Sequence, residues 1–206
     1  EDLPYTNRKI IVARSYVSLL PFAEVRAEDS RPDDNTPRDR TGHGTAVAMV
    51  AAGRRVSGPA ATITGVAPKA FLGNYKIFGS PGVNDATRSS VIIRALQDAI
   101  ADGMDIVTLS LGSPAEYGPL VRDSSCAGPS PGFDIPSDAC DVRAYAVENA
   151  VRLGLTVVVP AGNDGIEFDV PAYNTINTPG TASSAITVGA STNAHVWFST
   201  VRVESG

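Results

Sequence analysis

Apolar residues from about position 85 onward follow a repeated pattern of helix, glycine and strand. In the first unit, apolar residues recur at helical spacing after Asp85, and the segment 106–111 (IVTLSL) then predicts a buried strand. In the second unit, Asp141 starts a helix, Gly154 ends it, and residues 155–159 predict another continuously apolar strand. Strands of this kind are typical of a parallel sheet with helices on both faces.

The rest of the chain extends this pattern. Further strands are expected at 9–13, 71–78 and 185–188, and a helix of small residues from His43 to about Gly53. The apolar residues expected on the packing face of that helix are Ala46, Val47, Val50 and Ala51. The alternation of strands and helices predicts an α/β domain with three layers, a mostly parallel sheet and helices on both faces.

One domain is expected over residues 1–206. Hydrophobic residues make up 43% of the chain and charged residues 19%, which is enough to build a buried core. A charged, Pro-containing stretch at 23–42 predicts an exposed loop, and the Ser-, Pro-, Gly- and Asp-rich stretch 113–140 predicts an irregular insertion. Because the first strand starts almost at residue 1 and no closing element follows 193–206, we expect an incomplete domain, part of a longer protein.

Charge and composition argue against several functions. Lys and Arg total 17 against 22 Asp and Glu, a net charge of −5, and no basic run is present, which disfavours nucleic-acid binding. The longest apolar stretches, such as 155–160, are far too short to span a membrane. A nucleotide-binding domain is also disfavoured, because no glycine-rich phosphate loop joins a strand to a helix.

The two cysteines, Cys126 and Cys140, are fourteen positions apart. They are either two unrelated free thiols or a local disulfide formed in an oxidising compartment. We favour the disulfide.

Three short segments carry candidate chemistry. His43 lies in the segment 39–45 (DRTGHGT) at the start of the small-residue helix and is either a loop histidine or a general base. Asn163 follows the second apolar strand and is either a turn residue or a rigid amide donor to an oxyanion. The segment Ser110–Gly112 is either a plain strand end or a backbone left open to pair with an extended peptide.

Taken in order, five segments resemble the subtilisin-like serine proteases (subtilases). They are the His-Gly-Thr at 43–45, then 65–70 (GVAPKA), 105–112 (DIVTLSLG), 158–163 (VVPAGN) and 185–190 (AITVGA). The resemblance covers roughly residues 40 to 192. It implies an incomplete subtilisin-like fold, with residues 193–206 as the approach to an inserted domain, and the hydrolysis of peptide bonds by acyl transfer.

The resemblance also implies a role for each matching residue. His43 would be the catalytic base and Asn163 the oxyanion donor, and the two would converge across one groove. Ser110, Leu111 and Gly112 would bind the substrate backbone, and Ala161 and Gly162 would line the facing wall of the primary specificity pocket.

Two catalytic residues of the family have no match in the chain. Upstream of His43 no aspartate has the expected Asp-Thr/Ser-Gly context, and Asp39 is interpreted as lining the substrate cleft. The segment 180–183 (GTAS) imitates the nucleophile motif, but a strand-like run follows it, so Ser183 is rejected as the nucleophile. We therefore expect a serine endopeptidase in the intact parent protein and no activity from these 206 residues alone. The alternative is a pseudoprotease or peptide-binding module that lacks both residues.

Partners and location follow from the same resemblance. A polypeptide substrate and a secreted or extracellular location are expected, and exposed sheet edges favour self-association. No cofactor is expected for the chemistry. Relatives often bind calcium for stability, but the acidic stretches 28–39 and 134–141 do not have the spacing of a recognisable calcium loop.

Overall fold

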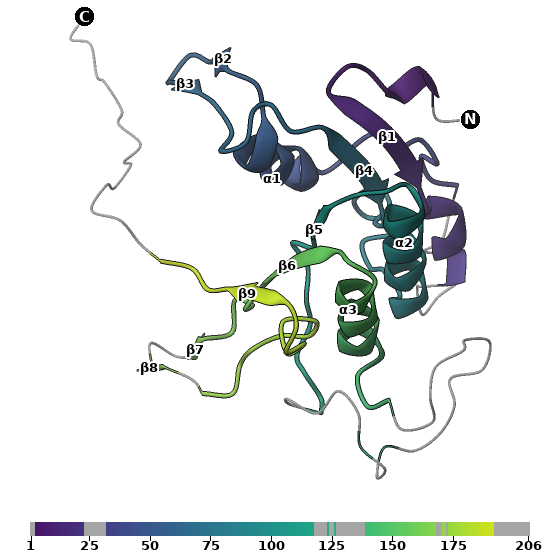
Figure 1. Ribbon diagram of the computed structural model, residues 1–206, viewed down its shortest axis with the longest axis vertical. Coiled ribbons are helices and arrows are strands. Elements are labelled where there is room, and N and C mark those ends of the chain that lie inside the picture. The colour runs from purple at the N-terminus through teal and green to yellow at the C-terminus, as the bar shows by residue number, and fades with distance from the viewer. Residues whose placement is uncertain are drawn as a thin grey trace, which may run out of the picture.

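The computed structural model describes residues 3–22, 32–117, 123, 126, 139–167, 170–171 and 173–191 (Figure 1). The α-helices are α1 (His43–Ala52), α2 (Ser89–Ala101) and α3 (Val142–Arg152), and 3₁₀ turns occur at Leu3–Tyr5 and Val17–Phe22. The strands are β1 (Ile10–Ser15), β2 (Val56–Ser57), β3 (Thr62–Ile63), β4 (Leu72–Lys76), β5 (Ile106–Thr108), β6 (Thr156–Pro160), β7 (Ile166–Glu167), β8 (Val170–Pro171) and β9 (Ile186–Val188). Most of the predicted insertion 113–140 and all of 193–206 lie outside the described residues.

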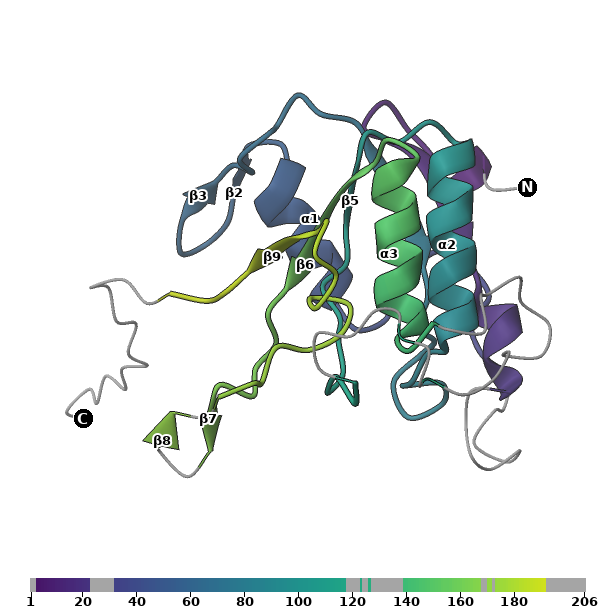
Figure 2. The same ribbon diagram turned by 60° about the horizontal axis from the view of Figure 1, so that its bottom comes forward.

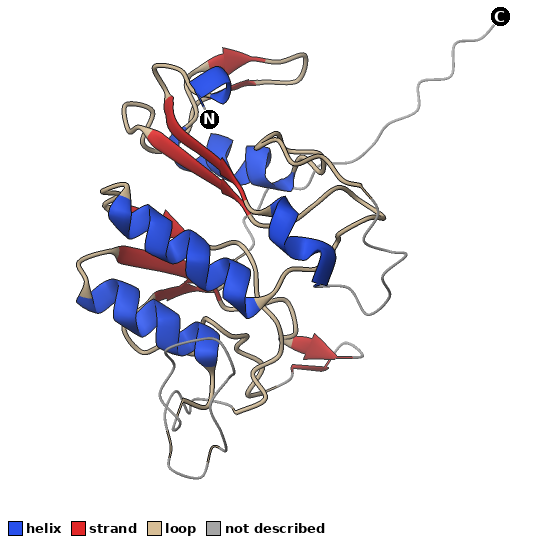
Figure 3. Cartoon of the chain, turned by 90° about the vertical axis from the view of Figure 1, so that its right-hand side faces the viewer, coloured by secondary structure: helices blue, strands red, loops and turns tan. Residues whose placement is uncertain are grey.

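The parallel strands form two separate groups. β1 pairs with β4, while β6 lies between β5 and β9, and every pairing within the two groups is parallel. Figure 3 shows the two groups as distinct sheets rather than the single sheet that the sequence predicts. β4 and β5 are joined through α2, yet among the described strands each has a neighbour on one side only.

The strands and helices are arranged as expected for an α/β fold, but among the described helices only α2 and α3 pack closely on the strands. α2 and α3 lie side by side on one side of the strands β5 and β6, and α1 lies on the other side of these strands (Figure 2). The apolar positions that the sequence places on α2 and α3 are buried against the strands. The core residues from these elements are Ile92, Leu96, Ala99, Val147, Ala150, Leu155, Val157 and Val159.

Two predictions about burial are wrong for the described residues. Only alternate residues of β6 are buried, and Ile106 of β5 is 64% exposed, so these strands are covered on one face rather than two. The expected packing face of α1 is also open, with Val50 69% exposed. The reason in both cases is that no described element packs against these surfaces.

Local signals predict the helix ends well, with one exception. Asp141 accepts hydrogen bonds from the amides of Arg143 (3.0 Å) and Ala144 (3.1 Å) and so caps α3 as expected. Gly154, with a φ of 104°, ends α3 in a left-handed conformation that glycine favours. Asp85 does not cap α2. Its carboxylate instead accepts a hydrogen bond from the amide of Gly82, and α2 begins at Ser89.

The two cysteines form a disulfide. Cys126 and Cys140 are bonded, with their Cα atoms 5.1 Å apart. The predicted local disulfide is therefore confirmed.

A polar cluster joins the first sheet to the C-terminal end of α2. Arg14 of β1 donates from Nε and Nη2 to the two oxygens of Asp102 at 2.8 and 2.6 Å, and the Tyr75 hydroxyl of β4 donates to the same carboxylate at 2.8 Å. Tyr16 donates to Asp98 at 2.9 Å. The hydrogen bond from Arg14 lowers the pKa of Asp102, outweighing the opposite effect of burial.

Asp102→Asn is expected to lower the free energy of unfolding by about 1–2 kcal/mol at pH 7, because it removes a charge that accepts three hydrogen bonds. The pKa of Asp102 is lower in the folded than in the unfolded chain, so its stabilising effect is present above about pH 4 and lost as the pH falls below that value. Urea denaturation across pH checks both points. Asp105→Asn, at an exposed carboxylate three residues along, is the control, and equal midpoints for the two variants would contradict the prediction.

Candidate active site

Two predicted substrate-binding segments leave the same edge of one sheet. β5 and β6 are parallel, with Thr108 opposite Val158, and the amide of Leu109 donates to the Val158 carbonyl at 3.0 Å. Ser110–Gly112 and Ala161–Asn163 therefore follow the carboxyl ends of neighbouring strands, where α/β sheets place their ligands.

A third segment connects these two strand ends. The amide of Asn177 donates to the Ala161 carbonyl at 2.9 Å. The next residue, Thr178, forms two backbone hydrogen bonds with Ser113. The Thr178 amide donates to the Ser113 carbonyl at 2.9 Å, and the Ser113 amide donates to the Thr178 carbonyl at 3.2 Å. Residues 177–178 thus hold the end of β6 beside the chain that leaves β5.

The glycines of the two segments are required by close packing. Gly162 has a φ of 107°, a left-handed conformation that glycine favours, and a Cβ atom there would lie 2.7 Å from Asn177 Cγ. A Cβ atom at Gly112 would lie 3.1 Å from Asn177 Cβ. The structure therefore brings Gly112 and Gly162 together around a residue that the sequence reading did not single out.

His43 and Asn163, the predicted base and oxyanion donor, are both exposed. His43 is the first residue of α1, and Asn163 comes directly after Gly162. Their convergence across one groove stays a prediction.

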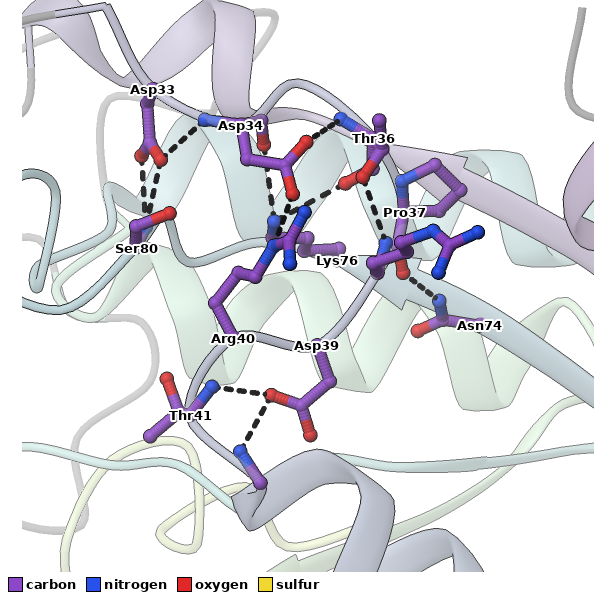
Figure 4. A network of polar contacts seen from close by, with 12 residues as sticks. Asp33, Asp34, Thr36, Pro37, Asp39, Arg40, Thr41, Asn74, Lys76 and Ser80 are labelled. Carbon is purple, nitrogen blue, oxygen red and sulfur yellow. Dashed lines mark hydrogen bonds and ion pairs between the residues drawn. The ribbon is translucent and has the colours of Figure 1, made fainter.

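The start of α1 is held by Asp39, three residues before the N-cap Gly42 (Figure 4). One carboxylate oxygen of Asp39 accepts from the amides of Thr41 and Gly42, each at 2.8 Å. The other accepts from the amide (2.9 Å) and hydroxyl (2.7 Å) of Thr45. Burial alone would raise the pKa of Asp39, but these hydrogen bonds outweigh it and lower the pKa.

The loop before Asp39 is tied to β4. Lys76 donates to the carbonyls of Asp34 (3.1 Å) and Thr36 (3.2 Å), and Asn74 donates to the carbonyl of Pro37 at 2.7 Å (Figure 4). Asp34 also forms an ion pair with Arg40. A continuous set of polar contacts therefore connects β4 to the turn that carries His43.

The other end of α1 is fixed by the predicted segment 65–70. The amides of residues 65, 66 and 67 donate to the carbonyls of Gly53, Val50 and Ala51 at 2.9, 3.0 and 2.8 Å. A Cβ atom at Gly65 would lie 2.3 Å from the nitrogen of Gly53, so only glycine allows this approach. Both ends of the helix that begins with His43 are thus anchored, the start by the Asp39 carboxylate and the end by backbone hydrogen bonds.

Asp39→Ala is expected to cost about 1 kcal/mol of stability, because it removes the acceptor for the first turn of α1. Amide hydrogen exchange at Thr41, Gly42 and Thr45 should accelerate, while exchange within α3 should not. Asp164→Ala, at another exposed carboxylate, is the control. Unchanged exchange at these three amides would show that Asp39 does not hold the turn.

Ser183, in the segment that imitates a nucleophile motif, has another role. Its hydroxyl donates to Glu148 of α3 at 3.0 Å, and Glu148 also accepts from the amide of Ser184 at 3.0 Å. Burial alone would raise the pKa of Glu148, but the bonds from Ser184 and Ser183 outweigh it and lower the pKa. These contacts tie the turn before β9 to α3.

In the described part of the chain, no group of three or more His, Cys, Asp or Glu side chains is arranged to hold a metal ion. None of the described helices has the length and apolar character needed to cross a bilayer.

Comparison with known proteins identifies the family to which the chain belongs. The sequence profile of the subtilase family matches residues 20–205. The chain is 32% identical over 196 residues to subtilisin-like protease SBT3.11 of Arabidopsis thaliana, covering 91% of this chain and 22% of that protein. It is 33% identical over 169 residues to the CO(2)-response secreted protease of the same plant, covering 77% of this chain and 18% of that protein. The chain belongs to the subtilase family.

A solved structure supports the fold. Sphericase superposes with a TM-score of 0.50 at 29% identity, covering 77% of this chain and 44% of that protein. The fold is therefore subtilisin-like and incomplete. The chain spans about a fifth of the length of the plant relatives.

Proposed function

We propose that this chain is part of the catalytic domain of a serine-type endopeptidase. The observation that supports this most is the parallel register of β5 and β6, because it places Ser110–Gly112 and Ala161–Asn163 at one sheet edge in a chain of the subtilase family. Extended polypeptide would pair with the backbone of Ser110, Leu111 and Gly112, and its side chain would face Ala161 and Gly162.

The proposed reaction is acyl transfer. A serine hydroxyl attacks the peptide carbonyl carbon, and His43 takes up the hydroxyl proton. The Asn163 carboxamide donates to the oxyanion of the tetrahedral intermediate. His43 then gives the proton to the leaving amine as the C–N bond breaks, and water hydrolyses the acyl-enzyme by the same steps.

The nucleophilic serine, and the aspartate that the family places beside the catalytic histidine, have no matching motif in residues 1–206. We therefore assign the activity to a protein that joins this chain to those two residues, and we expect the 206 residues alone to be inactive. Secretion is proposed on two grounds: one relative is named a secreted protease, and the Cys126–Cys140 disulfide is of a kind that persists in oxidising compartments.

A fluorophosphonate probe tests this proposal. The full-length protein that contains this chain should be labelled at one serine outside residues 1–206 and should cleave a denatured protein substrate. The 206-residue chain should remain unlabelled. Labelling of a serine within the chain would refute the assignment of the nucleophile, and a full-length protein that is neither labelled nor active would favour a pseudoprotease.

A further inference from the structure

The proposed substrate-binding segment Ser110–Gly112 is held at its two ends. Before it, the buried residue Leu109 donates its amide to the Val158 carbonyl at 3.0 Å. After it, Ser113 makes its two backbone hydrogen bonds with Thr178. Among the residues that the structure describes, no backbone hydrogen bond joins 110–112 itself to a neighbouring segment. The position of this backbone therefore depends on what fixes the residue at each end.

A side chain from α3 also fixes Ser113. The guanidinium of Arg143 donates from Nη2 to the Ser113 hydroxyl at 2.6 Å, and both residues are half-buried. A hydrogen bond from a charged donor is roughly twice as strong as one between neutral groups. Ser113 is thus held through its backbone by Thr178 and through its side chain by Arg143.

Arg143 is itself fixed at the start of α3. Its amide donates to the Asp141 carboxylate at 3.0 Å, and Asp141 is buried. Cys140, directly before Asp141, is also buried and is bonded to Cys126. Arg143 therefore reaches Ser113 from an anchored helix end, across 30 positions of sequence.

We infer that Arg143 is a positioning residue: by fixing Ser113, it holds the backbone of Ser110–Gly112 where a polypeptide substrate pairs with it. The inference rests on the proposed function. Arg143 acts through Ser113 and not on the reacting atoms. Its effect is therefore large for a substrate long enough to pair with this segment and absent for a small ester, which needs only the serine, the base and the oxyanion donor.

The test uses the full-length protein that contains this chain and two substrates. One is a fluorogenic peptide with several residues before the scissile bond, and the other is p-nitrophenyl acetate, which is too small to pair with 110–112. Arg143→Ala should lower kcat/KM for the peptide by about tenfold, because it removes a hydrogen bond from a charged donor. The loss should appear as a higher KM, because backbone pairing is made in the ground state as well as in the transition state. kcat/KM for the ester should not change.

Further variants isolate the contact. Arg143→Lys keeps the charge and a donor, so it should recover part of the loss for the peptide. Ser113→Ala removes the acceptor but keeps both backbone hydrogen bonds with Thr178, so it tests the same contact even if Arg143→Ala fails to fold. The double variant should be no worse than either single variant, because both break one contact. Arg152→Ala is the matched control: Arg152 is exposed in the last turn of α3, and both substrates should be cleaved at wild-type rates.

The outcomes separate this inference from the function on which it rests. If the substitutions at 113 and 143 leave KM for the peptide unchanged, lower kcat/KM equally for peptide and ester, or have additive effects, the inference is overturned while the protease assignment stands. If the full-length protein hydrolyses neither substrate and no serine reacts with a fluorophosphonate, the proposed function fails and the inference fails with it.

Discussion

Under the proposed function, His43→Ala is expected to lower kcat of the full-length protein by about 10⁶-fold, a magnitude known for the histidine of subtilisin itself and adopted for this relative. Without the imidazole, no group takes the proton from the serine hydroxyl or returns it to the leaving amine. KM should change little, because the proposed backbone-binding residues Ser110–Gly112 remain. Steady-state kinetics on a peptide substrate measures both quantities.

Two measurements on the His43→Ala variant distinguish the loss of a catalytic base from a disturbance of α1. Added imidazole should restore part of the activity of the alanine variant, which would not happen if the substitution had only disturbed α1. Amide exchange at Gly42 and Thr45 should stay as slow as in the wild type, because Asp39 still caps the helix. A variant that keeps a tenth of the wild-type kcat would show that His43 is not the base.

Asn163→Ala is expected to lower kcat by about 10²–10³-fold, again the value known for the corresponding donor of subtilisin and adopted for this relative. The carboxamide acts on the charge of the tetrahedral intermediate and not on the ground-state substrate, so KM should stay within a few-fold.

Asn149→Ala on α3 is the control for this second prediction, because Asn149 lies between α2 and α3 and away from the strand ends. Full activity is expected for that variant. Equal kcat for Asn163→Ala and the wild type would show that Asn163 does not donate to the oxyanion. Asn163 would then be a turn residue, the other interpretation of its sequence.

Helices with local signals were predictable from the sequence alone. The spacing of Ile92 and Leu96 and the cap at Asp141 depend on residues within a few positions of each other, and the structure agrees with both. Asp85 is a residue type that often caps helices, but α2 begins four residues later, and the Asp85 carboxylate accepts a hydrogen bond from the amide of Gly82. The extent of β5 and the exposure of Val50 depend on what packs against them, which local sequence does not specify.

The structure adds Asn177 to the site and gives Asp39 a further role. The sequence predicts Asp39 only as a residue that lines the substrate cleft. Its contact with Thr45 depends on a turn, and the spacing of Asp, Gly and Thr could have indicated such a turn. Asn177 lies 65 positions from Gly112 in a stretch without periodicity. Their contact depends on the pairing of β6 with both neighbouring strands.

The disulfide matters for a protein that we propose cuts peptide bonds. Any self-inflicted break between Cys126 and Cys140 would leave the two resulting pieces covalently joined. The N-terminal piece would keep His43 and β5, and the C-terminal piece would keep α3 and β6. Under the proposed function, autolysis between these two cysteines would therefore give a nicked protein whose two pieces separate on a denaturing gel only after reduction.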